Sequence, residues 1–330
     1  MIAELSANHG QSLQRARELV CAAAASGADA IKLQTYTPDT ITIDCDNPHF
    51  KIQGTACDGQ SLYKLYQTTF TPWEWHQELR DLTHSLGLEF FSTPFDETAV
   101  EFLEALEVPV YKIASFELVD IALLKQVALT GKPVIASTGM ASENEIRMAV
   151  ETLRTNGCEE LALLKCTSAY PAPPNSLKLS LVQRLINDFE CLSGISDHTL
   201  GNEAAIAAVA LGGSIVEKHI TLSRAEGGPD AGFSLEPDEF AKMVDSVRKT
   251  EQMLAGTEYG AAANEEPCRR LRRSIFVVQD IRAGEMFNQS NLRSIRPGSG
   301  LPSVHLDEVQ GRVAKVNLSR GTPLSWDHIQ

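Results

Sequence analysis

The sequence has no long apolar run, and none of its stretches approaches the roughly 18 apolar residues that a membrane-spanning helix needs. It also lacks an excess of positive charge, because 29 Lys and Arg stand against 43 Asp and Glu, for a formal net charge of −14. Nucleic-acid recognition depends on basic surfaces, so this balance argues against such a partner. The first residues, MIAELSANHG, carry acidic Glu4 where a secretory signal would be basic, and they have no sufficient apolar core. We therefore expect a cytoplasmic protein that binds neither membranes nor nucleic acid.

Paired cysteines and a dinucleotide-binding turn are missing as well. The seven cysteines are odd in number and scattered, and no two form a CxxC pair, so the spacing predicts neither a disulfide framework nor a zinc knuckle. Cys166 and Cys191 lie in apolar, strand-like runs, as is typical of inert core thiols. No GxGxxG turn follows the first strand-like run, which disfavours a doubly wound open sheet.

What the sequence does contain is an alternation of β-rich runs with helical patterns. Eight such runs, each followed by a helical segment, extend over about 250 residues, which predicts a (β/α)8 TIM barrel. A doubly wound open sheet is the runner-up. The runs are 2–8, 30–36, 89–95, 110–115, 133–138, 160–169, 191–199 and 215–221.

Two of the helices have explicit start and stop signals. Residues 71–74 (TPWE) read as a capping box with proline at the first helical position, and Gly87 closes that helix. Residues 142–145 (SENE) form a second capping box, and Gly157 closes the helix that follows.

One strand-to-helix connection, residues 37–71, is unusually long. Long loops in compact domains are usually functional or disordered. This one carries the aromatic residues Phe50, Tyr63 and Tyr66, so we expect an ordered lid.

The last part of the chain differs in composition from the rest. The helix after the eighth run ends near Leu254, and a Gly-, Ala- and Glu-rich linker follows. We expect a catalytic barrel at 1–257, a linker at 258–268 and a small β-rich module at 269–330, marked by the turn signals RAGE, RPGSG and SRGTP. From Glu265 onward Lys and Arg outnumber Asp and Glu, ten to seven. Because so small a piece has little core, we expect it to dock on another surface.

Three lysines lie in strand-like runs that are otherwise made of Ile, Leu, Val and Ala. They are Lys32, Lys112 and Lys165. Burying an unpaired ammonium group is expensive, so their presence favours a strongly anionic ligand. Hydroxyl groups and backbone N–H groups at the same strand ends would complete a phosphate site. The alternative without a ligand-binding role is that each lysine is solvated at a strand edge.

His198 and His219 end adjacent strands, the seventh and the eighth. Two neutral imidazoles at a barrel mouth can hold a divalent ion with open positions. Two protein ligands favour Mn²⁺ or Mg²⁺ completed by water and substrate over a closed zinc site. Two structural histidines bonded to loops are an equally weighted alternative.

With these residues in place, the ordered motifs resemble those of the sialic acid synthase family over essentially the whole chain. The motifs are IAELSANH, IKLQTY, FFSTPFD, YKIASFE, ASTGM, KCTSAYPAP, GISDHT, EKHITL and RSIRPGSGL. The resemblance implies a (β/α)8 barrel followed by an antifreeze-like (SAF) domain, a domain-swapped homodimer and a divalent metal, with Mn²⁺ preferred and Mg²⁺ or Co²⁺ possible. It implies condensation of phosphoenolpyruvate with an amino-sugar aldehyde. The chain departs from the family at its front, where the first strand begins at once, which leaves open a less well closed barrel floor or a different start of the chain.

The resemblance also assigns roles to individual residues. It places the metal on His198 and His219 and puts Glu4 and Glu117 near the reacting carbons, either of them as the base. Arg296 is expected to reach into the partner's site. The expected substrate-binding residues are Lys32, Thr93, Lys112, Ser115, Ser137, Lys165, Ser168 and Ser196 on the phosphoenolpyruvate side, and Gln34, Tyr170 and Asp230 on the sugar side.

Within the family, the stretches AELSANH, SLYKLYQTTFTPWEWH and KCTSAYPAP look most like the pseudaminic acid branch. The N-acetylneuraminate and legionaminic acid branches are the alternatives. The sugar of the pseudaminic branch is a 6-deoxy, diacetamido compound, so we expect an apolar pocket supplied by the lid residues Phe50, Leu62, Tyr63 and Tyr66. Two remoter alternatives are a metal-independent Schiff-base aldolase acting through Lys112 or Lys165 and a non-catalytic sugar-phosphate sensor.

Overall fold

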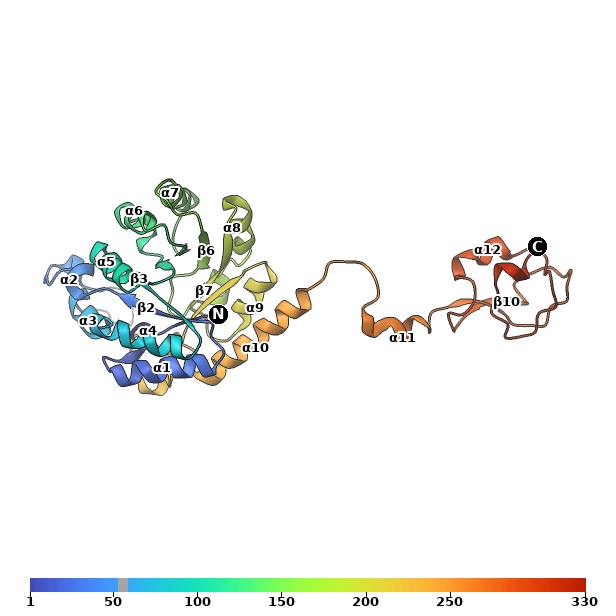
Figure 1. Cartoon of the computed structure of the whole chain (residues 1–330), viewed down its shortest axis with the longest axis horizontal. Helices are drawn as coiled ribbons and strands as arrows, with labels where there is room; N and C mark the ends of the chain where they lie inside the picture. The colour runs from blue at the N-terminus through green and yellow to red at the C-terminus, as the bar shows by residue number, and fades with distance from the viewer. Residues whose placement is uncertain (53–58) are drawn as a thin grey trace. The chain divides into compact units, whose positions relative to one another are not determined.

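The computed structural model describes residues 1–52 and 59–330, which form two compact units, Met1–Ala255 and Gly256–Gln330. The first unit is built on a closed barrel of eight parallel strands in sequence order, as predicted (Figure 1). β1 pairs with both β2 and β8, so the barrel is closed at the front of the chain. The strands are β1 (Ile2–Glu4), β2 (Ala30–Thr35), β3 (Glu89–Pro94), β4 (Tyr111–Ile113), β5 (Val134–Ser137), β6 (Leu161–Cys166), β7 (Leu192–Asp197) and β8 (Ile215–His219).

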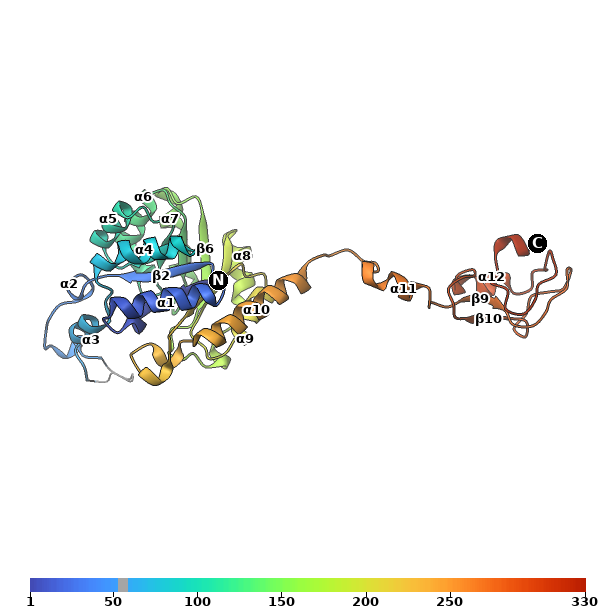
Figure 2. The ribbon, with the colours of Figure 1, turned by 60° about the horizontal axis from the view of Figure 1, so that its bottom comes forward.

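Helices surround this barrel and cover its outer face (Figures 1 and 2). They are α1 (Leu13–Ala25), α2 (Pro38–Ile41), α3 (Leu62–Thr69), α4 (His76–Ser85), α5 (Glu97–Ala105), α6 (Ile121–Leu129), α7 (Glu143–Thr155), α8 (Leu181–Phe189), α9 (Glu203–Ala210) and α10 (Pro237–Leu254). Because the strands are buried by helices on one side and by the barrel interior on the other, they read as nearly continuous apolar runs.

Helix α7 illustrates how the sequence sets an element of the outer layer. Its buried residues Ile146, Ala149, Val150 and Leu153 follow the three- and four-residue spacing of one helical face. The predicted capping box is present at its start, because the Ser142 hydroxyl accepts from the backbone of Glu145 and the Glu145 carboxylate accepts from that of Ser142.

The capping box predicted at residues 71–74 does not form. A 3₁₀ turn at Trp73–Trp75 comes first, and α4 begins only at His76, without a side-chain cap. The Thr71 hydroxyl lies 3.1 Å from Nε2 of His9 and is therefore committed to a tertiary contact. Sequence spacing alone does not reveal such a competing partner.

The first predicted strand is too long for a similar reason. β1 ends at Glu4, and Ser6–His9 form a 3₁₀ turn that begins with a positive φ of 45° at Ser6. The Asn8 amide then donates to the Ile220 carbonyl, which ties this turn to the chain just after β8. The backbone therefore turns at the carboxyl end of β1, and the side chain of Glu4 lies at the last position of the strand.

A buried ion pair joins the ends of β7 and β8 on the outer side of the barrel. The Lys218 ammonium lies 2.7 Å from the Asp197 carboxylate, and both side chains are fully buried. Removing one partner of such a pair typically costs about 3–5 kcal/mol, because the other charge stays buried and unpaired. The pair immediately precedes His198 and His219 in the sequence, so it helps to fix the strand ends that carry the two imidazoles.

The expected lid, residues 37–71, is described except for 53–58, so Cys57 lies outside the described residues. The described parts contain α2 and α3, and Lys51 and Ser61 form an isolated antiparallel bridge. Tyr66 packs edge-on against Tyr36 with ring centroids 5.5 Å apart, which attaches α3 to the end of β2.

The second unit has a small core of its own. Strands β9 (Ser274–Val277) and β10 (Leu292–Ile295) pair antiparallel, and the unit also contains α11 (Glu266–Arg269) and α12 (Leu306–Val309). Its buried cluster includes Ile275, Phe287 and Leu292. In the described part of the chain, no helix has both the length and the apolar character needed to span a membrane.

Candidate active site

A cavity of about 490 Å³ opens at the carboxyl ends of the barrel strands. This is where the active sites of (β/α)8 enzymes lie. Most of the residues expected from the sequence line it: Lys32, Gln34, Thr93, Lys112, Ser115, Glu117, Ser137, Tyr170, Ser196, His198, His219 and Asp230.

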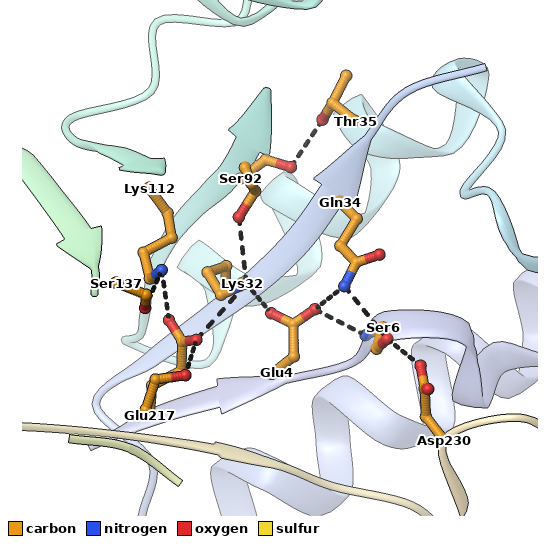
Figure 3. A network of polar contacts seen from close by, with 12 residues as sticks. Glu4, Ser6, Lys32, Gln34, Thr35, Ser92, Lys112, Ser137, Glu217 and Asp230 are labelled. Carbon is orange, nitrogen blue, oxygen red and sulfur yellow. Dashed lines mark hydrogen bonds and ion pairs between the residues drawn. The ribbon is translucent and has the colours of Figure 1, made fainter. Parts of the chain in front are cut away.

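A network of four buried charges lies at the cavity, and three of the four residues line it (Figure 3). Lys32 forms an ion pair with Glu4 and lies 3.9 Å from Glu217, while Lys112 lies 4.0 Å from the other oxygen of Glu217. All four side chains are at least 95% buried. We call these residues, Glu4, Lys32, Lys112 and Glu217, the charge network.

The charge network determines the protonation of its members. Burial raises the pKa of Glu4, even though Lys32 opposes the effect. Burial also favours the neutral form of Glu217, but Lys112 and Lys32 outweigh it and lower the pKa of this carboxyl. Burial lowers the pKa of Lys112, whereas Glu217 and Glu4 outweigh burial at Lys32 and raise its pKa. Glu217 is therefore the anion that holds two cations in the barrel.

Glu217 has no role among the residues assigned from the sequence. The signal that could have found it is charge balance, because two lysines buried in a barrel need carboxylates beside them. Glu217 stands two residues before His219 on β8, so the alternation of a strand places both on the same face. Its Oε1 also accepts a hydrogen bond from Ser196, at 3.0 Å.

Hydroxyl groups surround the two lysines of the cavity. Lys112 Nζ donates to Ser137 at 2.6 Å, and Lys32 Nζ donates to Thr93 at 3.2 Å. Ser115 accepts from the backbone N–H of Gly139 at 3.0 Å. Two ammonium groups among hydroxyls form a site suited to a phosphate or a carboxylate.

Glu117 stands apart from the charge network at the wall of the cavity. Burial raises its pKa to about 7. Its Oε2 atom is buried and has no hydrogen-bond partner, whereas Glu4 accepts from Ser6 N–H and from Gln34, both at 3.1 Å. Burial thus raises the pKa of both glutamates expected near the reacting carbons, and the value of about 7 makes the Glu117 proton exchangeable near neutral pH.

His198 and His219 face one another with ring centroids 5.3 Å apart. His198 Nδ1 lies 3.1 Å from the carbonyl of Thr167, so this nitrogen donates and leaves the Nε2 lone pair free. His219 Nδ1 is buried without a partner, and burial lowers the pKa of His219 well below its ordinary value, which keeps the ring neutral.

At His198, by contrast, burial is outweighed by the contacts with Cys166 and the Thr167 carbonyl, which raise the pKa. Once Nε2 of His198 is deprotonated, this ring and the neutral His219 ring beside it fit a divalent metal ion. In residues 1–52 and 59–330, no cluster of three or more His, Cys, Asp or Glu side chains could hold one. A metal on this pair would therefore keep several positions for water and substrate, as Mn²⁺ or Mg²⁺ commonly does.

The rest of the cavity lining is partly polar and partly aromatic. The Ser6 hydroxyl donates to Asp230, and Gln34 donates to Ser6 at 3.2 Å. Tyr170 packs on His198 with ring centroids 4.6 Å apart. Apolar surface comes from Tyr36, Phe95, Phe116 and Phe233.

The lid contributes apolar surface as expected, but mostly through other residues than those named. Of Phe50, Leu62, Tyr63 and Tyr66, Tyr66 alone lines the cavity, and Ile41 and Leu65 of the lid join it. The Tyr63 hydroxyl instead donates to Asp39 within the lid.

Three expected site residues lie elsewhere. Lys165 and Ser168 line a neighbouring cavity behind β6, and Arg296 is an exposed residue of the second unit. Side chains alternate along a strand, so Cys166 faces the barrel while Lys165 faces outward. Cys166 is accordingly not an inert core thiol: it lines the site cavity, and its sulfur lies 3.8 Å from His198 Nδ1.

Comparison with known proteins agrees with this geometry. Residues 19–259 match the model of the NeuB family, and residues 272–330 match that of the SAF domain. Pseudaminic acid synthase of Helicobacter pylori is 41% identical over 100% of this chain and 97% of its own length. N,N'-diacetyllegionaminic acid synthase of Legionella pneumophila is 37% identical over 100% and 94%. The crystal structure of N-acetylneuraminic acid synthetase from Leptospira borgpetersenii superposes with a TM-score of 0.72 at 32% identity, covering 81% of this chain and 88% of that one.

We predict that the protein binds Mn²⁺ through the histidine pair and that His219→Ala weakens this binding at least about 100-fold, since even a second-shell partner contributes about 10–100-fold. Titration followed by the electron paramagnetic resonance of free Mn²⁺ measures this. His84→Ala, an exposed histidine at the end of α4, is the matched control. Equal Mn²⁺ affinity in His219→Ala and His84→Ala would contradict the assignment.

Proposed function

The chain belongs to the NeuB family, and from this premise we propose that it joins phosphoenolpyruvate to 2,4-diacetamido-2,4,6-trideoxy-L-altrose, giving pseudaminic acid and inorganic phosphate in the cytoplasm. The observation that carries the proposal is the barrel-end cavity, where two buried lysines and two adjacent histidines meet. It offers a site for a strongly charged small anion beside one for a divalent ion. Relatives named pseudaminic acid synthase, 39–41% identical over nearly the whole chain, support the choice of sugar.

The charge network and its hydroxyls bind phosphoenolpyruvate in this proposal. Lys32 and Lys112 offset its negative charge, and Ser115, Ser137 and Ser196 donate to its oxygens. Holding the anion against the sugar makes a bimolecular reaction effectively unimolecular, which supplies much of the rate enhancement. The wall of Gln34, Tyr170 and Asp230 holds the open-chain sugar.

When bound by His198 and His219, Mn²⁺, or Mg²⁺ or Co²⁺ in its place, supplies Lewis-acid chemistry at the aldehyde oxygen. C3 of phosphoenolpyruvate forms the new bond to the aldehyde carbon with the electrons of the C2–C3 double bond. Water adds to C2 and gives one proton to Glu117, which passes it to the former aldehyde oxygen. The C2–O bond to phosphate then breaks, the leaving phosphate takes the second proton of the added water, and the keto acid remains.

We predict that phosphate release is fastest with 2,4-diacetamido-2,4,6-trideoxy-L-altrose and slower with N-acetylmannosamine. An aromatic wall accepts a methyl group and a second acetamido group, but apolar pockets discriminate by only about 10–200-fold per group. Comparison of kcat/KM over a panel of amino-sugar aldehydes with Mn²⁺ measures the preference.

Faster turnover of N-acetylmannosamine, or of the sugar precursor of legionaminic acid, would overturn the pseudaminic assignment and leave the family chemistry intact. Activity in excess chelator, together with an adduct trapped by borohydride on Lys112, would instead establish the Schiff-base alternative. Ligand binding without phosphate release from any sugar would establish a sensor.

We predict that kcat/KM for phosphoenolpyruvate rises as the pH is raised through about 7, because Glu117 has a raised pKa and acts as a base only when deprotonated. Glu117→Gln should lower the rate by about 10²–10⁴-fold and abolish this rise of kcat/KM with pH. Glu97→Gln, an exposed acid at the start of α5, should change neither. If the residual activity of Glu117→Gln still rises with pH in this range, the rise belongs to another titrating group, such as the phosphate of phosphoenolpyruvate.

We further propose that the protein works as a domain-swapped homodimer in which Arg296 enters the partner's cavity to contact the sugar. The support is the family resemblance, the excess of basic residues after Glu265 and the exposure of Arg296. We predict that Arg296→Ala and His219→Ala, each nearly inactive alone, regain activity after subunit exchange, since a mixed dimer contains one intact site. Absence of rescue after exchange is verified by mass would show that Arg296 does not act between subunits.

A further inference from the structure

A second cavity, of about 480 Å³, lies behind β6 on the outer side of the barrel. Its walls come from the turn after β5, from α7, from the outer face of β6 and from α8. We call it the side cavity. It shares Cys166 with the site cavity but otherwise has its own lining.

Lys165 is the unusual residue of the side cavity. Among the described residues four lysines are buried, and three of them have a carboxylate within 4.0 Å: Lys32, Lys112 and Lys218. Lys165, which is 8% exposed, has none within that distance in the described chain. Its ammonium donates only to neutral oxygens, the Cys166 carbonyl and the Thr167 hydroxyl, at 3.1 Å from the latter.

Burial of an ammonium group without a counter-charge is costly, and every other buried lysine of the described chain avoids that cost. Lys178 lines the same cavity and likewise has no described carboxylate within 4.0 Å, so it adds a second positive charge. Consistently, burial lowers the pKa of Lys165 against the opposing effect of Cys166, and Lys178 adds to the lowering.

The acids that line the side cavity are already engaged. Glu143 and Asp188 lie 3.3 Å and 3.1 Å from Arg184, and Glu143 also lies 3.0 Å from Arg147. These pairs leave the charges of Lys165 and Lys178 uncompensated. The cavity therefore has an excess of positive charge.

Hydroxyl groups complete the surroundings. Ser168 Oγ, in the wall of the side cavity, is buried and has no hydrogen-bond partner among the described residues. Thr167 and Ser176 contribute further hydroxyls to the same wall. Two ammonium groups with several hydroxyls match the many oxygens and double charge of a phosphate group better than the two oxygens of a carboxylate.

We propose that the side cavity is a second anion site, which binds a phosphate group, free or as a monoester, through Lys165, Lys178 and Ser168. It adjoins the site cavity at Cys166, and the proposal does not depend on the proposed reaction. The volume exceeds what inorganic phosphate needs and falls in the range of about 300–1,000 Å³ found for small-molecule sites. Apolar side chains on α7 and α8, such as Ile146 and Leu185, leave room for the body of an ester.

Equilibrium dialysis of the full chain against radiolabelled inorganic phosphate tests the proposal. We expect Lys165→Met to lose one bound phosphate per chain relative to the wild type, and Lys165→Arg to retain it. Lys178 is exposed, so Lys178→Met is not expected to misfold. It should weaken phosphate binding at the same site by about tenfold, which corresponds to the loss of one charge-assisted hydrogen bond of about 1.4 kcal/mol. Lys125→Met, an exposed lysine of α6 outside both cavities, is the charge-matched control.

Competition identifies the ligand. If glycerol phosphate displaces the radiolabelled phosphate whose binding depends on Lys165, the site accepts monoesters. If unlabelled inorganic phosphate displaces it and glycerol phosphate does not, the site is for the free anion. Equal displacement by acetate at the same ionic strength would overturn the choice of phosphate. Phosphate binding that is identical in the wild type, Lys165→Met and Lys178→Met would overturn the site itself. A protein that fails to turn over any sugar yet keeps the Lys165-dependent phosphate would refute the proposed function and leave this inference standing.

Discussion

The site depends first on the mutual neutralisation of four charges inside a closed barrel. Lys32 and Lys112 could not remain buried without Glu4 and Glu217, and the two acids could not remain buried without the lysines. The set is neutral when all four groups are ionised. An incoming anion meets two ammonium groups that are already in place, so little reorganisation is needed to stabilise its charge. Because the groups interact strongly, the binding of an anion shifts the protonation of the whole charge network rather than of one residue.

The barrel makes this arrangement possible by placing alternate side chains on opposite faces. On β8, Glu217 and His219 point to the interior, whereas Lys218 between them points outward to Asp197. One face of β8 thus carries Glu217 of the charge network and the expected metal ligand His219, and the other face carries Lys218 of the structural ion pair. The outward pair also joins β8 to β7 beside the two histidines, so the packing that stabilises the barrel also holds the imidazoles in place.

Much of this was accessible from the sequence. Eight apolar runs with polar ends predicted the fold, and the lysines and histidines at those ends predicted an anionic ligand and a metal at one cavity. The predicted strands were longer than the real ones, because a polar residue such as Ser6 continues the sequence pattern after the backbone has turned. Lys165 was placed in the wrong cavity because composition shows that a strand holds a lysine but does not show which face it takes.

Other features depended on contacts that no single segment contains. The role of Glu217 follows only from its distances to Lys32 and Lys112, which lie on different strands. The lid offered four apolar side chains, but whether each reaches the cavity depends on how α3 packs against the end of β2. The raised pKa of Glu117 likewise arises from burial by distant parts of the chain.

Thr167, in the loop after β6, contacts one residue of each cavity. The Thr167 carbonyl accepts from His198 and so orients the imidazole in the site cavity, while the Thr167 hydroxyl accepts from Lys165 in the side cavity. A charge that draws the Lys165 ammonium away from this hydroxyl therefore acts on the residue that positions His198. Both contacts are partly buried, so one residue of this loop serves a histidine of the site cavity through its carbonyl and the lysine of the side cavity through its hydroxyl.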